Sequence, residues 1–169
     1  MSALAGNAAM IGLALYATHH VGDYWFQTDH MAAHKGKAEG EGRRACLAHV
    51  GTYLATQAAG VGIAVWALDI PVTLWGVLLG LAISGVTHYM ADRREFGLMF
   101  WVARKLGKDG FMRLGVPRGR IIHVVDEPSD SLVAVPLDNP SLGTGAWALD
   151  QSWHIFWGVF VTAIIMAVV

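Results

Sequence analysis

The amino-acid sequence predicts an all-α polytopic membrane protein, folded as a bundle of four transmembrane helices. Of its 169 residues, 54% are hydrophobic and only 15% are charged, and the mean hydropathy is positive. Such a composition is too apolar for an ordinary soluble domain of this size. The single cysteine excludes an internal disulfide and a cysteine-rich zinc site. We expect one integral membrane domain over residues 1–169.

Four apolar stretches are long enough to cross a hydrocarbon core about 30 Å thick, which takes a helix of about 20 residues. They cover approximately residues 3–26, 45–68, 72–91 and 146–169. Ala and Gly dominate the first half of the first stretch, which suits close packing of helices in lipid. Asp69 and Pro71 separate the second stretch from the third and predict a tight turn.

A long polar connection, residues 92–145, joins the third span to the fourth. Its first part, DRREFGLMFWVARKLG, predicts an amphipathic helix in the membrane interface. The side chains expected to face lipid are Phe96, Met99, Phe100 and either Val102 or Ala103. The stretches RIIHVVDE and SLVAVPL predict a short hairpin, and the rest of residues 107–145 carries no pattern that predicts a structure.

The basic residues predict the orientation in the membrane. All twelve Lys and Arg residues lie in two connections, four in residues 28–44 and eight in residues 92–145. In a four-span protein these connections share a side, and the positive-inside tendency places that side in the cytoplasm. Both termini are then expected outside. The lipid bilayer is the expected partner, nucleic acid is not, and the sequence gives no indication of an oligomeric state.

Three His–Asp pairs at i, i+4 spacing lie at the ends of apolar stretches: His19 with Asp23, His88 with Asp92, and Asp150 with His154. On a helix this spacing places both side chains on one face. Each pair falls at the cytoplasmic end of its span, and His49 falls at the same depth, one turn into the second span. Ionisable groups in membrane spans are costly and face the bundle interior. We therefore expect these seven side chains to meet in one site.

The residue types in this site indicate a metal. Imidazole and carboxylate groups without thiolates suit Zn²⁺, with Mn²⁺ or Fe²⁺ as alternatives. Seven groups exceed one tetrahedral site, so the sequence leaves open one ion or two. The candidate metal ligands are His19, Asp23, His49, His88, Asp92, Asp150 and His154. The candidate catalytic residues are Asp23, Asp92, Asp150, Gln27 and Gln151.

Other polar residues are weaker candidates. His20 would point about 100° away from His19 on a helix, His30 and His34 are expected to be solvated, and His123 is expected to be structural. Four arginines can hold a phosphate or an anionic lipid head group near the site, or can simply flank the spans. They are Arg93, Arg94, Arg118 and Arg120.

The sequence also resembles a known family. The run His19-x-x-x-Asp23-Tyr-x-x-Gln27-Thr-x-x-Met31-Ala-x-x-Lys35 resembles the signature of small, uncharacterised bacterial and phage membrane proteins described as a domain of unknown function. Further matches are His49 with Tyr53, His88-x-x-x-Asp92-Arg93, and Leu149-Asp150-Gln151-x-x-His154. That family is similar in pattern to membrane-bound proteins described as metal-dependent hydrolases. The resemblance implies a metal hydrolase of the bacterial inner membrane, encoded by a bacterium or a phage.

Two hypotheses for the function follow. The first is a metal-dependent hydrolase that attacks a lipid-borne or amphiphilic ester or phosphoester at the cytoplasmic leaflet, with an activated water beside a carboxylate base. The second is a metal-binding membrane module that transports, senses or scaffolds without chemistry. The nearly apolar outer halves of the third and fourth spans favour a one-sided site over a channel. Polar contacts that only join the helices are a third reading of the same residues.

Overall fold

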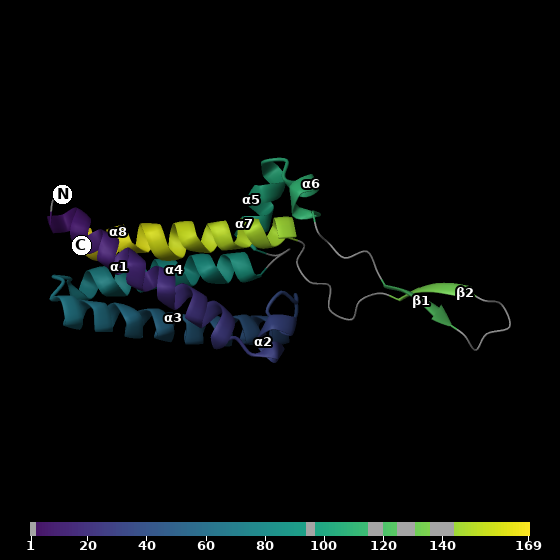
Figure 1. Ribbon diagram of the computed structural model, residues 1–169, viewed down its shortest axis with the longest axis horizontal. Coiled ribbons are helices and arrows are strands. Elements are labelled where there is room, and N and C mark those ends of the chain that lie inside the picture. The colour runs from purple at the N-terminus through teal and green to yellow at the C-terminus, as the bar shows by residue number, and fades with distance from the viewer. Residues whose placement is uncertain (1–2, 94–96, 115–119, 125–130, 136–143) are drawn as a thin grey trace.

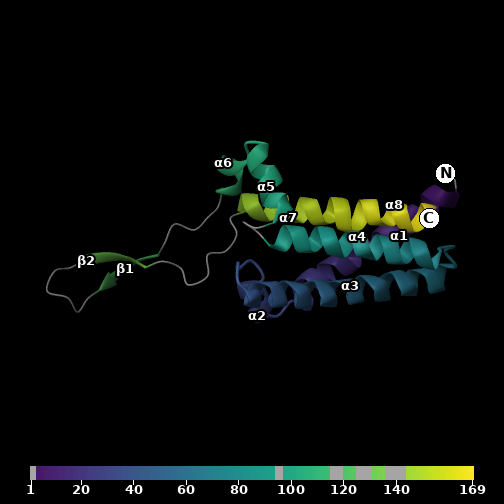
Figure 2. The same ribbon diagram turned by 180° about the vertical axis from the view of Figure 1, so that it is seen from behind.

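The computed structural model describes residues 3–93, 97–114, 120–124, 131–135 and 144–169. Long helices lie side by side in a bundle (Figures 1 and 2). Its segments are α1 (Ala3–His20) with the π-helix η1 (Val21–Trp25), α3 (Gly40–Leu68), α4 (Leu74–Asp92), and α7 (Thr144–His154) continued by the π-helix η3 (Ile155–Val161) and α8 (Thr162–Val168). Both α1 and α4 pack on α3 and on α8, so the segments close in a ring.

Three helices within the described ranges are long and apolar enough to cross a membrane, and they therefore suit contact with a lipid bilayer. They are Gly40–Leu68, Leu74–Asp92 and Gly145–Val168, which correspond to the predicted spans 45–68, 72–91 and 146–169. The predicted span 3–26 does not qualify. Its helix α1 has 18 residues and includes the polar Asn7, His19 and His20. By length and hydropathy, three helices in the described part of the chain are candidate spans, where the sequence predicted four.

The two ends of the bundle differ in character (Figure 1). At one end lie the termini and the turn between α3 and α4, where Asp69 ends α3 in a left-handed conformation with φ 51°. We call this the apolar end. At the other, here called the charged end, lie α2 (Asp29–His34), α5 (Leu98–Lys105) and α6 (Asp109–Met112). The main core extends towards the apolar end and consists of Ile11, Leu15, Val61, Ile70, Val159, Ala163 and Met166.

Helix α5 turns towards protein the side chains that were predicted to face lipid. Three of its apolar side chains are buried, namely Met99, Phe100 and Ala103. Met99 and Phe100 form a small core with Ala91 of α4 and Ala146 of α7. The prediction of their direction is wrong because α5 folds back onto α4 and α7, which supply an apolar protein surface. Val102 is half-buried, and Phe96 lies outside the described residues.

The predicted hairpin is confirmed. β1 (Arg120–Val124) pairs antiparallel with β2 (Ser131–Val135), with Ile122 opposite Val133. His123 belongs to β1, but its side chain is not among those described. Residues 115–119, 125–130 and 136–143 of the polar connection also lie outside the described parts of the chain.

The connection from η1 to α3 is attached to the end of α4. Arg93 donates from Nη1 to the backbone carbonyl of Lys35 (2.9 Å) and from Nη2 to that of Ala38 (3.5 Å). Gly42, in the first turn of α3, makes this approach possible. A Cβ at Gly42 would overlap the carbonyl of Lys37 and lie 3.0 Å from Arg93 Nη1.

Replacing Gly42 with Ala is expected to lower the thermal unfolding midpoint of the detergent-solubilised protein. The overlap with Lys37 displaces the connection at a cost of about 1–3 kcal/mol, which exceeds the roughly 1 kcal/mol gained in helix propensity. Gly51→Ala is the matched control, because a Cβ there meets nothing within 4 Å. A midpoint for Gly42→Ala equal to or above that of the control would contradict the packing described.

Candidate metal centre

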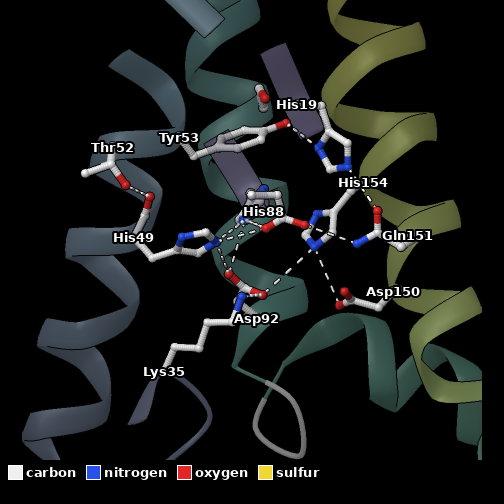
Figure 3. Close-up of polar contacts among 12 residues, drawn as sticks. His19, Lys35, His49, Thr52, Tyr53, His88, Asp92, Asp150, Gln151 and His154 are labelled. Carbon is white, nitrogen blue, oxygen red and sulfur yellow. Dashed lines mark hydrogen bonds and ion pairs between the residues drawn. The ribbon is translucent and has the colours of Figure 1, made fainter. Parts of the chain in front are cut away.

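The charged end of the bundle buries a cluster of His and Asp side chains from every segment of the ring (Figure 3). All seven predicted metal-ligand candidates lie there: His19 on α1, Asp23 on η1, His49 on α3, His88 and Asp92 on α4, and Asp150 and His154 on α7. Their exposed fractions run from 0% to 8%. The structure thus brings together the groups that the sequence placed at one depth.

Two of the three predicted His–Asp pairs form within their own helices. His88 Nε2 lies 3.1 Å from Asp92 Oδ2, and His154 Nε2 lies 3.5 Å from Asp150 Oδ1. In both cases the i, i+4 spacing on a regular α-helix places the two side chains on one face, as expected.

Asp23 takes a partner that its spacing did not predict. Its Oδ1 lies 3.1 Å from Nε2 of His49 on α3. Asp23 belongs to the π-helical turn η1, whose wider turn breaks the register with His19. Gly22 lets η1 approach α3 closely, because a Cβ there would lie 3.2 Å from Tyr53 Cα. A local change of helix type therefore directs this carboxylate across the bundle.

The centre of the cluster is formed by His49 and His88, whose Nε2 atoms are 3.1 Å apart. Asp23 Oδ1 is 3.1 and 3.7 Å from these nitrogens, and Asp92 Oδ2 is 3.3 and 3.1 Å from them. A tetrahedral ion with ligand distances of about 2.0–2.2 Å holds its ligands about 3.3–3.6 Å apart. The measured separations are close to this spacing, so these donors can hold a metal ion.

A second group of donors shares His88 with the first. Its members are His88, Asp92 and His154, whose ligand atoms lie within 4.8 Å of one another. Two buried atoms of this group, His154 Nε2 and Asp92 Oδ2, lie within ion-pair distance of their neighbours but make no hydrogen bond of good geometry among the described residues. A buried polar atom without a hydrogen bond is costly, and a cation between these atoms would satisfy both. One ion and two ions both fit the donors.

Lys35 is the main residue of the cluster that the candidate site set lacked. It is 9% exposed, and its Nζ lies 2.8 Å from Asp92 Oδ1. Burial opposes the charged ammonium, but the carboxylates of Asp92 and Asp23 outweigh it and raise the pKa of Lys35. The sequence analysis gave Lys35 no role in the site, because it lies in a polar connection. The available signal was its position at the end of the family-like run that begins at His19.

Among the described side chains, the charges of the cluster do not balance. Three buried carboxylates, those of Asp23, Asp92 and Asp150, face one buried ammonium, that of Lys35. With neutral imidazoles this leaves two negative charges in excess. Buried charge without a counter-charge costs several kcal/mol. A divalent cation would supply the missing positive charge.

His19 lies at the edge of the cluster in a hydrogen-bond network. Its Nδ1 is 3.2 Å from the Tyr53 hydroxyl and its Nε2 is 3.1 Å from Gln151 Oε1. Gln151 in turn donates from Nε2 to Asp23 Oδ2 (3.1 Å). Both ring nitrogens of His19 are thus engaged, and His19 belongs to neither buried donor group among the described residues. Its role as a metal ligand stays a prediction.

The network continues from Tyr53 towards the apolar end. Gln57 donates from Nε2 to the Tyr53 hydroxyl (2.8 Å) and to the carbonyl of Gly158 (3.1 Å), and Ser84 Oγ donates to Gln57 Oε1 (2.7 Å). Sequence reasoning did not select Gln57 or Ser84 for the site. The sequence did contain a signal for Tyr53 and Gln57, because they follow His49 at i, i+4 spacing on α3.

A cleft of about 190 Å³ opens beside the cluster. Four of the five predicted catalytic residues line it, namely Asp23, Gln27, Asp150 and Gln151, and Lys35 lines it as well. The Oε1 atom of Gln27 is buried and has no hydrogen-bond partner in the described parts of the chain. The fifth predicted catalytic residue, Asp92, does not line the cleft and is paired with Lys35.

The weaker candidates fall outside the cluster. His20 contacts the rings of Tyr16 and Tyr24, with centroids 4.7 and 5.7 Å away. Arg93 does not offer an anion site as predicted, because its buried guanidinium is bonded to backbone carbonyls. The side chains of Arg94, Arg118 and Arg120 lie outside the described residues.

The long apolar helices suggest a membrane protein, and the cluster at its charged end is a His–Asp centre that can hold a metal ion. Comparisons with protein-family models, with curated proteins and with solved structures found no match to this chain. The resemblance to a family of small membrane proteins therefore stays a prediction. The functional assignment rests on the geometry of the cluster.

Replacing His88 with Ala is expected to remove the metal held by the cluster, because His88 belongs to both donor groups. Elemental analysis of zinc-dialysed, tag-free protein should show a loss of at least one equivalent per chain. His20→Ala is the control, since His20 belongs to no donor group among the described residues and its ring contacts those of Tyr16, His19 and Tyr24. Equal metal contents in the two folded variants would show that the cluster is not the site.

Proposed function

We propose that this protein is an integral membrane metalloenzyme, a hydrolase of lipid-borne or amphiphilic esters or phosphoesters at the cytoplasmic leaflet. The observation that carries the proposal is a buried, negatively charged His–Asp cluster with a cleft beside it, at the charged end of an apolar bundle. Metal-assisted hydrolysis needs an ion, a carboxylate base and access for the substrate. The cluster offers donors that can hold an ion, and the cleft offers a carboxylate and access for a substrate.

The proposal includes α1 as a fourth membrane-crossing helix. It packs against two of the three candidate spans, α3 and the last helical segment with η3 and α8 (Figures 1 and 2). Large apolar side chains are exposed along its length, namely Leu4, Met10, Leu13 and Tyr16. The two termini lie together at the apolar end, as an even number of crossings requires. The helices of the two basic connections, α2, α5 and α6, lie at the charged end, which supports a cytoplasmic location for that end.

The ligands of the proposed ion are His49, His88, Asp23 and Asp92, with His154 available to the second group. This set of nitrogen and oxygen donors favours Zn²⁺ and also admits Mn²⁺ or Fe²⁺. A divalent ion there would lower the pKa of a coordinated water towards neutrality.

The residues of the cleft would supply the remaining chemistry. Asp150 lines the cleft and lies 3.5 Å from His154, and it is placed to accept a proton as the general base. Lys35 lines the same cleft and brings a positive charge to developing negative charge on a carbonyl or phosphoryl oxygen. Gln27 and Gln151 would orient the polar part of the substrate.

A transporter is less well supported than an enzyme. Transport needs a polar path to the opposite face. In the described part of the bundle, the buried polar side chains continue from the cluster through Tyr53, Gln57 and Ser84 to Thr162. Beyond these, Ile11, Val61, Ile70, Met166 and their neighbours form an apolar core. Sensing or scaffolding stays the alternative, and a test of hydrolysis distinguishes it from the proposal.

Replacing Asp150 with Asn is expected to lower turnover about 100-fold or more while bound metal is retained, because a general base contributes about 10²–10⁴-fold. The probes are a long-chain p-nitrophenyl ester and bis-p-nitrophenyl phosphate in detergent micelles. Asp69→Asn at the apolar end is the control, since Asn tolerates the left-handed conformation of that residue. Metal-loaded wild type that hydrolyses neither probe, or an Asp150→Asn variant with full activity, would count against the enzyme.

A reporter at the C-terminus is expected to lie outside the cytoplasm. Alkaline phosphatase fused there should be active and green fluorescent protein dark, whereas the same reporters inserted between Lys108 and Asp109 should behave oppositely. The reason is the separation of the C-terminus from the basic connections along the bundle. The same compartment for both positions would refute the proposed topology.

A further inference from the structure

A second group of metal-ligating side chains lies outside the buried cluster. His30 and His34 sit one turn apart on α2, and Glu41 lies in the first turn of α3. Their ligand atoms converge within 4.8 Å of one another. His30 is exposed, whereas His34 and Glu41 are half-buried. The prediction that both histidines are merely solvated does not describe His34.

The hydrogen bonds of His34 define which nitrogen faces Glu41. Its Nδ1 lies 2.8 Å from the backbone carbonyl of His30. A carbonyl only accepts, so Nδ1 carries a proton. In the neutral ring Nε2 then has a bare lone pair, and this atom faces Glu41 Oε1 at 3.3 Å. Two acceptors at this distance repel each other unless a second proton or a cation lies between them.

The surroundings of this pair match those of a ligand set. A backbone carbonyl that holds the far nitrogen of a histidine is the usual partner of a metal-ligating imidazole. The ring of His30 stacks on that of His34 with centroids 4.3 Å apart, which brings a second imidazole to the same place. Lys37 Nζ lies 3.7 Å from Glu41 Oε2, which leaves Oε1 directed at His34.

We propose that His30, His34 and Glu41 form a second, peripheral site for a divalent transition metal of the Zn²⁺ type. Two imidazoles and one carboxylate are a donor set that this class of ion favours, with water completing the coordination. The ion would join α2 to the start of α3 and so close the connection between them. That connection carries Lys35, the neighbour of His34, to Asp92. The peripheral ion would thus hold in place the segment that completes the buried cluster.

The test measures Zn²⁺ binding by competition with a chromophoric chelator, in full-length, tag-free protein with His88→Ala to disable the buried cluster. We expect about one equivalent per chain. His34→Ala and Glu41→Gln should each weaken its affinity by about 10-fold or more, as loss of a ligand predicts. Glu39→Gln should leave it unchanged, because Glu39 is exposed and its side chain makes no cap bond to α3.

The same substitutions in the wild-type chain should remove one zinc equivalent, so the result does not depend on the folding of the His88→Ala protein. Zn²⁺ should slow trypsin cleavage after Lys37 in the His88→Ala protein. It should not slow this cleavage when Glu41→Gln is added. If a proton and not a metal ion lies between His34 and Glu41, the His88→Ala protein should bind no Zn²⁺. That result, or equal Zn²⁺ affinities for Glu41→Gln and Glu39→Gln, would overturn the proposal.

Discussion

The arrangement of the charged end depends on the buried ion pair between Lys35 and Asp92. Lys35 holds Asp92 Oδ1 at 2.8 Å and leaves Oδ2 to His49 and His88. Removal of one partner of a buried pair typically costs about 3–5 kcal/mol. Arg93, next in the chain to Asp92, fixes the backbone of Lys35 itself. The geometry of the cluster is therefore coupled to a polar connection that lies outside the candidate spans.

Much of this organisation was predictable because long apolar helices and the charged residues at their ends form simple patterns in a sequence. Apolar length located α3, α4 and the last helical segment within a few residues. The i, i+4 rule placed His88 beside Asp92 and Asp150 beside His154. The predicted order of the spans put the three pairs at one depth. Ionisable groups at one depth in a small bundle all face its interior, so the pairs were expected to converge. The hairpin was predictable from its two short β-branched stretches.

The features that escaped prediction depend on contacts between distant segments. Asp23 contacts His49 because η1 is π-helical. A π-helical turn is not predictable from the local sequence pattern. Met99 and Phe100 face inward because α7 lies beside α5. Hydrophobic periodicity identifies the apolar face of a helix but not whether protein or lipid covers it. Lys35 lies in a polar connection outside the predicted spans, and only the folded connection brings it to Asp92. Sequence spacing defines the face of a helix, whereas the partner across that face is a property of the whole fold.

Polarity declines in steps along the bundle axis, and this gradient bears on what the site can do. Charged groups at the level of His49 and His88 give way to neutral hydrogen-bonded groups, Tyr53 and Gln57, and then to the apolar core around Val61. The neutral layer satisfies the inner edge of the cluster, through the bond from Tyr53 to His19, without placing charge deeper. A cluster of charged side chains can then lie below the surface of an apolar bundle, because the apolar core begins where a further charge would be costly.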